Sequence, residues 1–166
     1  MSKAFTSEET EDLPPLWRAP AALLPGQRRH ITPGGHRALL ARRAQWDAER
    51  SALAQPGARP DAERMRQLLA SLDALDRTLA MLTVAEAPAP GDPHVRLGSV
   101  VTLEEGSRTR RLRVVGPDEL GDGPDRVSVD SPLGRALLGA VAGEERDVEL
   151  PRGEVVLRVV HVDQGA

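Results

Sequence analysis

Apolar residues recur every three or four positions over residues 61–84, and this spacing constrains the fold more than any other feature of the chain. The stripe consists of Met65, Leu68, Leu72, Leu75, Leu79 and Leu82. Such spacing places all these side chains on one face of an α-helix, so it predicts a helix from residue 61 to residue 84. Burying each leucine contributes about 1.5–3 kcal/mol, so this face requires a partner.

A partner helix is predicted directly upstream, over residues 33–54. Thr32 can cap a helix, Pro33 suits the first helical position, and no further proline occurs before residue 56. Apolar side chains recur every seven residues and a neighbour widens their stripe: Leu39, Trp46 and Leu53, with Leu40 beside them. Two prolines and a glycine in residues 55–60 then reverse the chain. We therefore expect an antiparallel two-helix coiled coil within residues 31–87, because it hides both stripes.

The chain changes character after residue 87. The prolines of residues 88–94 favour extended backbone, which predicts a linker between two domains. β-branched runs separated by turn residues follow at residues 99–103, 111–115, 127–129, 147–150 and 155–162. Ser131 and Pro132 suit the start of a short helix over residues 133–138, and Gly139 suits its end. Residues 95–166 should form a small antiparallel sheet with one short helix, which makes the chain an α+β protein.

The first 30 residues are rich in proline and acidic residues, which predicts a disordered tail. A second interpretation is that residues 13–24, which contain Trp17, form a short docking motif. The 22 basic and 25 acidic residues leave a formal charge of −3, so the chain as a whole does not attract nucleic acid or an anionic membrane. It has no cysteine and no stretch of membrane-spanning length, which indicates a cytoplasmic protein without disulfides.

Three segments of the C-terminal part, residues 95–101, 112–119 and 127–139, precede Gly143 and residues 150–154. Their order and spacing are similar to the C-terminal domain of the Gre family of transcription factors, GreA and GreB. With the helical hairpin, the resemblance covers residues 31–163. It implies a coiled-coil N-terminal domain and an FKBP-like C-terminal domain. It also implies that the C-terminal domain binds RNA polymerase core at the rim of its secondary channel, while the coiled coil points toward the active centre.

The docking element that the resemblance implies is the loop entering the short helix. It corresponds here to Asp130, Ser131 and Pro132, with Leu133 behind them. A helix N-terminus exposes unpaired backbone N–H groups, which suits contact with a polar or acidic partner surface. The simpler interpretation is that Ser131 only caps the helix and Pro132 only starts it.

The predicted tip of the hairpin departs from the family. The resemblance implies that active Gre factors carry a Gly-Asp pair followed by an acidic residue and Asn, whose carboxylates hold a magnesium ion at the polymerase active site. Here Gly57 is followed by Ala58 and Arg59. Asp61 and Glu63 are the nearest carboxylates, and acidic residues in a first helical turn more often complement the helix dipole. Both arms also look about two or three turns shorter than those of cleavage-active members, which reduces the reach of the tip.

These departures favour a regulator that occupies the secondary channel and modulates or inhibits transcription without stimulating RNA cleavage. Shortened arms resemble those of Rnk, and altered tips resemble Gre-like inhibitors. The second hypothesis is a cleavage-stimulating elongation factor that uses Asp61 and Glu63. The third is a coiled-coil interaction module unrelated to polymerase. For the leading hypothesis we expect a monomer that is no enzyme itself and has no catalytic residue, metal or other cofactor.

A basic run in the C-terminal part leaves two interpretations open. It consists of Arg108, Arg110, Arg111 and Arg113. These side chains can contact nucleic acid or an acidic partner surface, or they can form a solvated face beside a turn. We favour the solvated face, so contact with nucleic acid is expected to be indirect at most.

Overall fold

The computed structural model describes residues 13–59 and 61–164. The acidic start of the predicted tail, residues 1–12, lies outside the described residues. The chain divides into two compact units, of which the first contains the segment up to Ala22 together with Leu39–Ala80. The second contains Leu23–Ala38 and Met81–Ala166, so the first turn of the first helix belongs to it.

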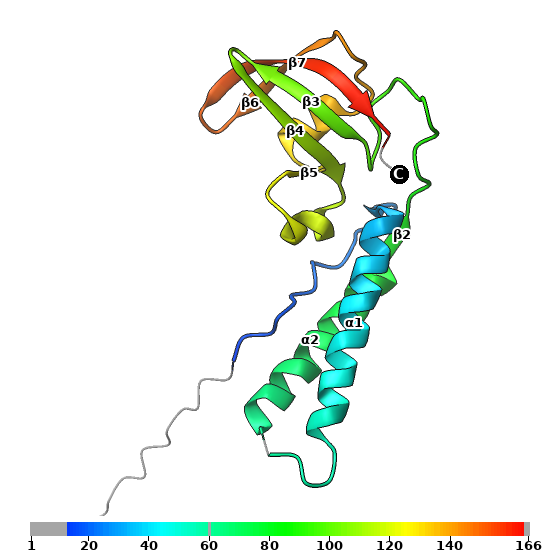
Figure 1. Cartoon of the computed structure of the whole chain (residues 1–166), viewed down its shortest axis with the longest axis vertical. Helices are drawn as coiled ribbons and strands as arrows, with labels where there is room; N and C mark the ends of the chain where they lie inside the picture. Colours follow the sequence, from blue (N-terminus) through cyan, green and yellow to red (C-terminus); the bar gives the residue numbers. More distant parts are fainter. Residues whose placement is uncertain (1–12, 60, 165–166) are drawn as a thin grey trace, which may run out of the picture. The chain divides into compact units, whose positions relative to one another are not determined.

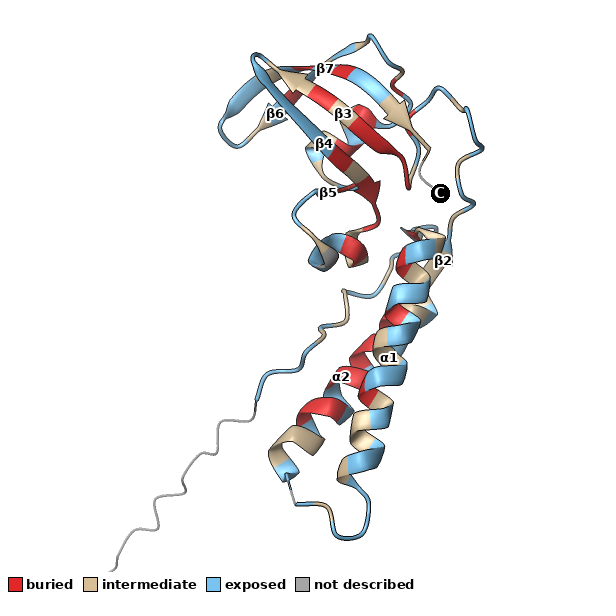
Figure 2. Cartoon of the chain, in the orientation of Figure 1, coloured by how far each residue is buried: buried red, intermediate tan, exposed pale blue. Residues whose placement is uncertain are grey.

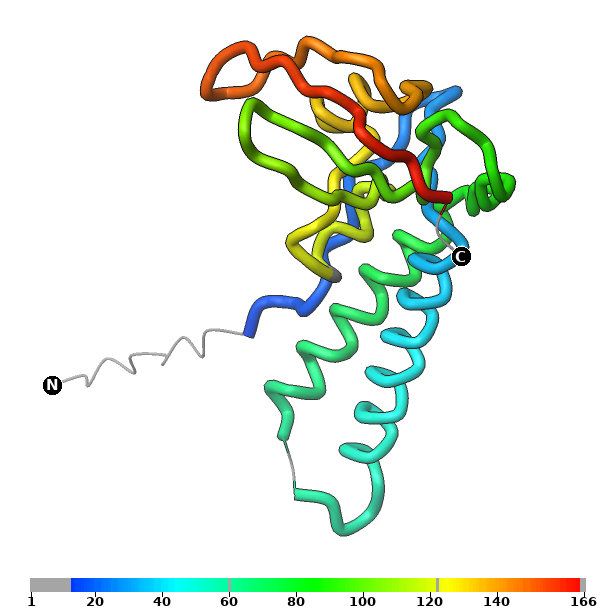
Figure 3. The backbone as a smooth tube through the Cα atoms, turned by 45° about the horizontal axis from the view of Figure 1, so that its top comes forward, coloured from blue at the N-terminus to red at the C-terminus, as the bar shows by residue number. Residues whose placement is uncertain are grey.

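Two long helices form most of the first unit: α1 (Pro33–Leu53) and α2 (Ala62–Met81). Figure 3 follows the chain along α1, through the tip and back along α2, so the two helices run antiparallel. Both lie where the sequence predicts them, and Pro33 is the first residue of α1 as expected. The prediction that the second helix continues to residue 84 is wrong, because Leu82 and its two β-branched neighbours form a strand.

The apolar stripes of the two helices are largely buried (Figure 2). The buried members, on α1 and α2 in turn, are Leu39, Trp46, Leu68, Leu72 and Leu75. Leu40 is 45% exposed, so the expectation that it widens the stripe of α1 is wrong. Two ion pairs also join the helices, Arg43 with Asp76 and Arg64 with Glu49. These pairs are partly exposed to solvent, so packing of the apolar stripes contributes most of the stability.

Five strands form a curled sheet in the second unit, in the order β5-β4-β3-β7-β6 (Figure 1). They are β3 (Val100–Glu105), β4 (Arg108–Val115), β5 (Arg126–Ser128), β6 (Glu145–Leu150) and β7 (Gly153–Asp163). The β3–β4, β3–β7 and β6–β7 pairs are antiparallel, whereas β5 pairs with β4 in parallel. The expectation of a purely antiparallel sheet is therefore wrong. The crossover through the short helix η1 (Pro117–Asp122) returns the chain in the direction of β4.

The short helix α3 (Pro132–Leu137) contacts β5 and β6 and contributes to the core of the sheet. The core is built from alternate strand residues and one face of α3, and its most deeply buried members include Val101, Leu103, Val114, Leu137, Leu157 and Val159. Their β-branched and leucine side chains are those that the sequence places in strands. The α+β class, the predicted strand regions and the single short α-helix after Ser131 are confirmed.

A second, smaller sheet pairs β1 (Arg29–Ile31) in parallel with β2 (Leu82–Val84). The sequence does not predict it, because residues 29–31 fall largely within the predicted tail and residues 82–84 within the predicted helix. Ile31 is fully buried, and Arg29 forms a bidentate ion pair with Asp118 of η1, at N–O distances of 2.5 and 3.0 Å. These contacts fix the chain just before α1.

A buried carboxylate holds the first turn of α1. Glu119 of η1 is 1% exposed and accepts hydrogen bonds from the backbone N–H of Thr32 at 3.0 Å, from the Thr32 hydroxyl at 2.5 Å and from the N–H of Gly116 at 2.8 Å. The Thr32 hydroxyl in turn accepts from the N–H of Gly35 at 2.9 Å, so Thr32 caps the helix as predicted. The negative charge that a helix N-terminus favours is thus supplied by the chain itself.

Candidate functional site

The predicted docking loop is a well-formed helix cap. Ser131 has extended backbone, its hydroxyl accepts from the N–H of Gly134 at 3.0 Å, and the same hydroxyl donates to the carbonyl of Ser128 at 2.7 Å. Pro132 follows in the first helical position. A Cβ on Gly134 would lie 1.9 Å from the Ser128 carbonyl oxygen, so this close turn requires glycine. Ser131 therefore caps α3 and Pro132 is its first residue, and these local roles leave the predicted contact with a partner open.

The residues on either side of this cap offer the surface that a partner can contact. The side chains of Asp130 and Pro132 are exposed, while Leu133 is half-buried and packs against the core. The backbone carbonyl of Asp130 accepts hydrogen bonds from the guanidinium of Arg135, at 2.9 Å and 2.5 Å, which fixes the loop. The four predicted docking residues therefore form a rigid corner with a carboxylate and a proline ring facing outward. Their docking role stays a prediction.

The tip of the hairpin is a tight turn. Gly57 has a φ of +89°, a left-handed conformation that favours glycine, and the N–H of Ala58 donates to the carbonyl of Gln55 at 3.1 Å. Ala58 and Arg59 follow, where the resemblance described above implies carboxylates in active Gre factors. The turn is therefore of the expected kind, with a methyl group and a positive charge at its end.

The carboxylates nearest to the tip are engaged with the helices. Asp61 accepts a hydrogen bond from the N–H of Arg64 at 2.9 Å and thereby caps α2. Glu63 lies in the first turn of α2, where it complements the helix dipole. On the other arm, the hydrogen bond from the Arg64 guanidinium lowers the pKa of Glu49 below its ordinary range. Each of these groups has a structural role in the hairpin.

A polar face of α2 has partners that the sequence does not reveal. Gln67, Ser71 and Thr78 are buried, at 7%, 0% and 0% exposure. They form three hydrogen bonds with the extended segment of residues 13–17. The Gln67 side-chain amide donates to the Pro14 carbonyl at 2.7 Å. The Leu16 N–H donates to the Ser71 hydroxyl at 2.8 Å, and the Trp17 indole N–H donates to the Thr78 hydroxyl at 2.9 Å. On the side of α2, the sequence signal of this contact is a set of polar residues at helical spacing beside the apolar stripe.

Trp17 is the best anchored residue of this N-terminal segment. Its ring is half-buried, and the guanidinium of Arg42 lies 5.6 Å from the ring centroid, at cation–π distance. The second interpretation of residues 13–24, as a docking motif, is therefore correct in one respect: the tryptophan packs on a helix. In this structure the helices belong to the same chain.

Within residues 13–59 and 61–164, no group of three or more His, Asp or Glu side chains is arranged to hold a metal ion. None of the helices in this part of the chain is long and apolar enough to span a membrane.

Comparison with known proteins identifies a family. The family model described as "Transcription elongation factor, GreA/GreB, C-term" matches residues 90–164. Transcription elongation factor GreB of Xanthomonas axonopodis pv. citri is 33% identical over 165 residues, which covers 89% of this chain and 96% of that protein. Transcription elongation factor GreA of Thermomicrobium roseum is 37% identical over 89 residues, or 53% of this chain and 57% of that protein.

The extent of these similarities varies. The chain spans 45% to 64% of the length of three of the curated relatives that it matches. Among solved structures, GreA factor homolog 1 (Gfh1) of Thermus thermophilus is 25% identical and aligns with a TM-score of 0.37, over 82% of this chain and 99% of that one.

Proposed function

The chain belongs to the GreA/GreB family of transcription elongation factors, and from this premise we propose that it binds RNA polymerase and modulates transcription without stimulating RNA cleavage. In this proposal the protein is a cytoplasmic monomer with no catalytic residue of its own. Residues 95–166 act as an FKBP-like docking domain, residues 31–87 act as a coiled coil that enters the secondary channel, and residues 88–94 link them.

The observation that carries this proposal is the chemistry of the tip. Delivery of a magnesium ion requires carboxylate oxygens that are free to coordinate it. Ala58 contributes none, Arg59 adds a positive charge, and the Asp61 carboxylate caps α2. A cation at this tip would meet repulsion from Arg59 and would have to compete with the N–H of Arg64 for Asp61. This arrangement favours occupation of the channel over activation of a water molecule.

Docking through the α3 corner is the second part of the proposal. The exposed carboxylate of Asp130 and the ring of Pro132 project from a loop that the Ser131 cap holds rigid. A preformed corner binds a partner without the entropic cost of ordering a loop. The polymerase surface that fits it would offer a basic or hydrogen-bond-donating group for Asp130 and an apolar groove for Pro132.

A cleavage assay tests the first part. Backtracked polymerase complexes with labelled RNA are incubated with and without the protein, and we expect no RNA shortening above the intrinsic rate. Shortened RNA that disappears on changing Asp61 and Glu63 to alanine would instead establish the cleavage-stimulating hypothesis. Run-off transcription in the same mixture should change with protein concentration, since the proposal requires an effect on synthesis.

A binding assay tests the second part. The purified protein should be retained by immobilised polymerase core, and Asp130→Arg should abolish retention. Asp147→Arg is the matched control, because Asp147 is exposed on β6 and the change in charge is the same. No retention of the unaltered chain would favour the interaction module unrelated to polymerase. Equal loss of retention in both variants would exclude docking through the α3 corner, which consists of residues 130–133.

A further inference from the structure

The parallel pairing of β5 with β4 brings together arginines that are distant in the sequence. Arg113 lies directly opposite Arg126 in the register of the two strands. Arg111 lies two residues before Arg113 on β4, and side chains two residues apart share a face of a sheet. Because Leu112 and Val114 point into the core, Arg111 and Arg113 lie on the opposite face.

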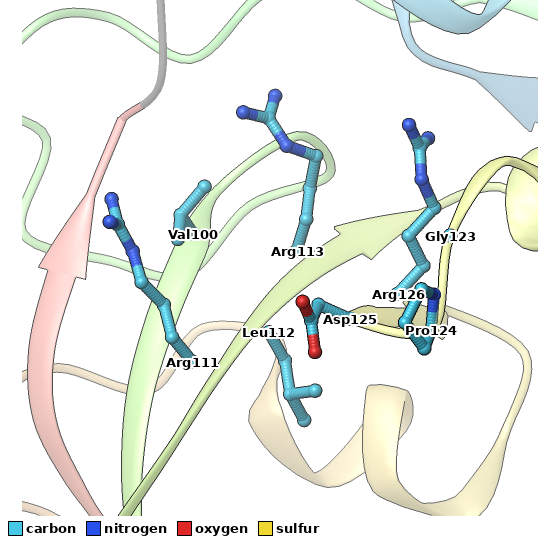
Figure 4. Close-up of a pocket in the computed structure, with 8 residues that line it drawn as sticks. All are labelled: Val100, Arg111, Leu112, Arg113, Gly123, Pro124, Asp125 and Arg126. Carbon is cyan, nitrogen blue, oxygen red and sulfur yellow. The ribbon is translucent and has the colours of Figure 1, made fainter.

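These three arginines line a cleft of about 520 Å³ on the second unit, with Val100 and Pro124 among its apolar walls. Figure 4 shows their guanidinium groups extending to the same side of the strands, while the carboxylate of Asp125 lies apart from them. The cleft therefore concentrates positive charge on a chain whose formal charge is −3. Like charges placed opposite each other in a sheet destabilise it, so this arrangement has a cost that an anionic ligand would offset.

The carboxylates near the cleft leave the charge of Arg111 and Arg113 largely unbalanced. Within the described part of the chain, Arg113 forms no ion pair. Arg111 forms one with Asp163 at 3.1 Å, but both side chains are about half exposed or more, so the pair is weak. Glu119 lines a smaller hollow with Arg113 and Arg126, and its oxygens already accept hydrogen bonds from Thr32 and Gly116.

We propose that this arginine cleft binds the phosphate groups of a small polyanion, such as a linear polyphosphate or the phosphate tail of a nucleotide. A guanidinium donates two parallel hydrogen bonds to a phosphate, and linked phosphates can engage several guanidiniums at once. A single peptide carboxylate would engage only one guanidinium of the cleft at a time. The volume of the cleft lies in the range of small-molecule sites.

Two observations favour a small ligand over a nucleic acid strand. Along β4, alternation places Arg108 and Arg110 on the face opposite to Arg111 and Arg113, so the basic run does not form one continuous track. In addition, residues 88–166 contain no Phe, Tyr or Trp on which bases could stack. The proposal goes beyond polymerase binding and does not depend on it.

Isothermal titration of the full chain with sodium tripolyphosphate tests the proposal. We expect saturable binding, and Arg113→Gln should raise the Kd about tenfold or more, as loss of charge-assisted hydrogen bonds requires. The matched control is Arg158→Gln, an exposed arginine of β7, which should leave the Kd within about twofold. Unchanged Tm values establish that each variant folds, and Arg111→Gln replaces Arg113→Gln if the latter does not.

Further titrations decide the kind of anion. Hexaglutamate should bind more weakly than tripolyphosphate, and equal affinity would overturn the proposal by showing that the cleft recognises charge alone. The affinities for a nucleoside triphosphate and for a short single-stranded oligonucleotide are compared at equal phosphate concentration. Because both ligands carry phosphate, this comparison distinguishes a free polyphosphate chain from a nucleic acid backbone. Absence of binding by tripolyphosphate, or equal weakening by Arg113→Gln and Arg158→Gln, would also overturn it.

Discussion

Two neighbouring glycines in the first turn of α1 provide a sharp test of the buried carboxylate. An ideal Cβ on Gly35 would lie 2.1 Å from the Glu119 Oε1 atom and 2.3 Å from its Cδ atom. A Cβ on Gly34 would have its nearest neighbour, the Thr32 hydroxyl oxygen, at 3.9 Å. We therefore expect Gly35→Ala to destabilise the protein and Gly34→Ala to stabilise it, although both exchange the same residue types one position apart.

The magnitudes follow from the contacts of Glu119. Alanine in place of a helical glycine raises the free energy of unfolding by about 0.5–1 kcal/mol, which is the expected gain for Gly34→Ala. With Gly35→Ala the Glu119 carboxylate must withdraw, because the new Cβ would overlap it. It then moves away from the donors of Thr32 and Gly116 that hold it in place. Losing two of these three hydrogen bonds to a charged group costs about 3–6 kcal/mol, so after the gain from alanine the net loss is about 2–5 kcal/mol.

Urea denaturation followed by far-ultraviolet circular dichroism measures both variants against the unaltered chain. Trp17 and Trp46 both lie in the first unit, so tryptophan fluorescence reports on the hairpin separately and reveals whether the two units unfold together. Glu119→Gln serves as a control, because it keeps the shape of the side chain and removes the charge. A Gly35→Ala variant as stable as Gly34→Ala would refute the assignment of Glu119 as the group that fixes this turn.

Three further predictions concern other polar contacts. Thr78→Val removes the acceptor of the Trp17 indole N–H, so it should lower the free energy of unfolding by about 1 kcal/mol and increase acrylamide quenching; unchanged quenching would contradict the contact. Hydrogen bonds from the His94 backbone and side chain, and from a neighbouring arginine, lower the pKa of Asp92 from 3.8 to about 2. The contribution of this carboxylate to stability is therefore complete above pH 3.8 and is lost as the pH falls toward 2. A carbon-13 titration of the Asp92 carboxyl group with a midpoint near pH 4 would contradict this prediction. Ser131→Ala removes the cap of α3 and should lower the free energy of unfolding by about 1 kcal/mol in urea denaturation. Ser131→Asn should retain most of the stabilisation by the cap, and equal stability of the two variants would exclude the cap.

The parts of the fold that depend on local chemistry were predictable from the sequence. Thr32 with Pro33, and Ser131 with Pro132, mark the starts of α1 and α3, because a capping hydroxyl and a proline act on the residues next to them. The β-branched runs mark the strands for the same reason. The end of α2 was missed, because Leu82 continues the helical spacing while it pairs in a strand with Arg29.

The features that depend on distant residues could not be predicted. Glu119 belongs to a segment that resembles the family, yet a glutamate is usually exposed, and only the fold provides the donors of Thr32 that make its burial favourable. Arg113 and Arg126 lie opposite each other because β4 and β5 pair in parallel, and no local sequence pattern predicts that pairing. The arginine run alone predicted a solvated face.

Among the docking residues that the resemblance implies at the start of α3, Ser131 is a poor probe of binding. The Ser131 hydroxyl donates to Ser128 and accepts from Gly134, so it has little capacity left for a partner. Removing it disturbs the backbone on which Asp130 and Pro132 are displayed. Loss of polymerase binding in Ser131→Ala would therefore report the conformation of the loop. A change at Asp130, whose side chain is exposed while the cap stays intact, reports the contact itself.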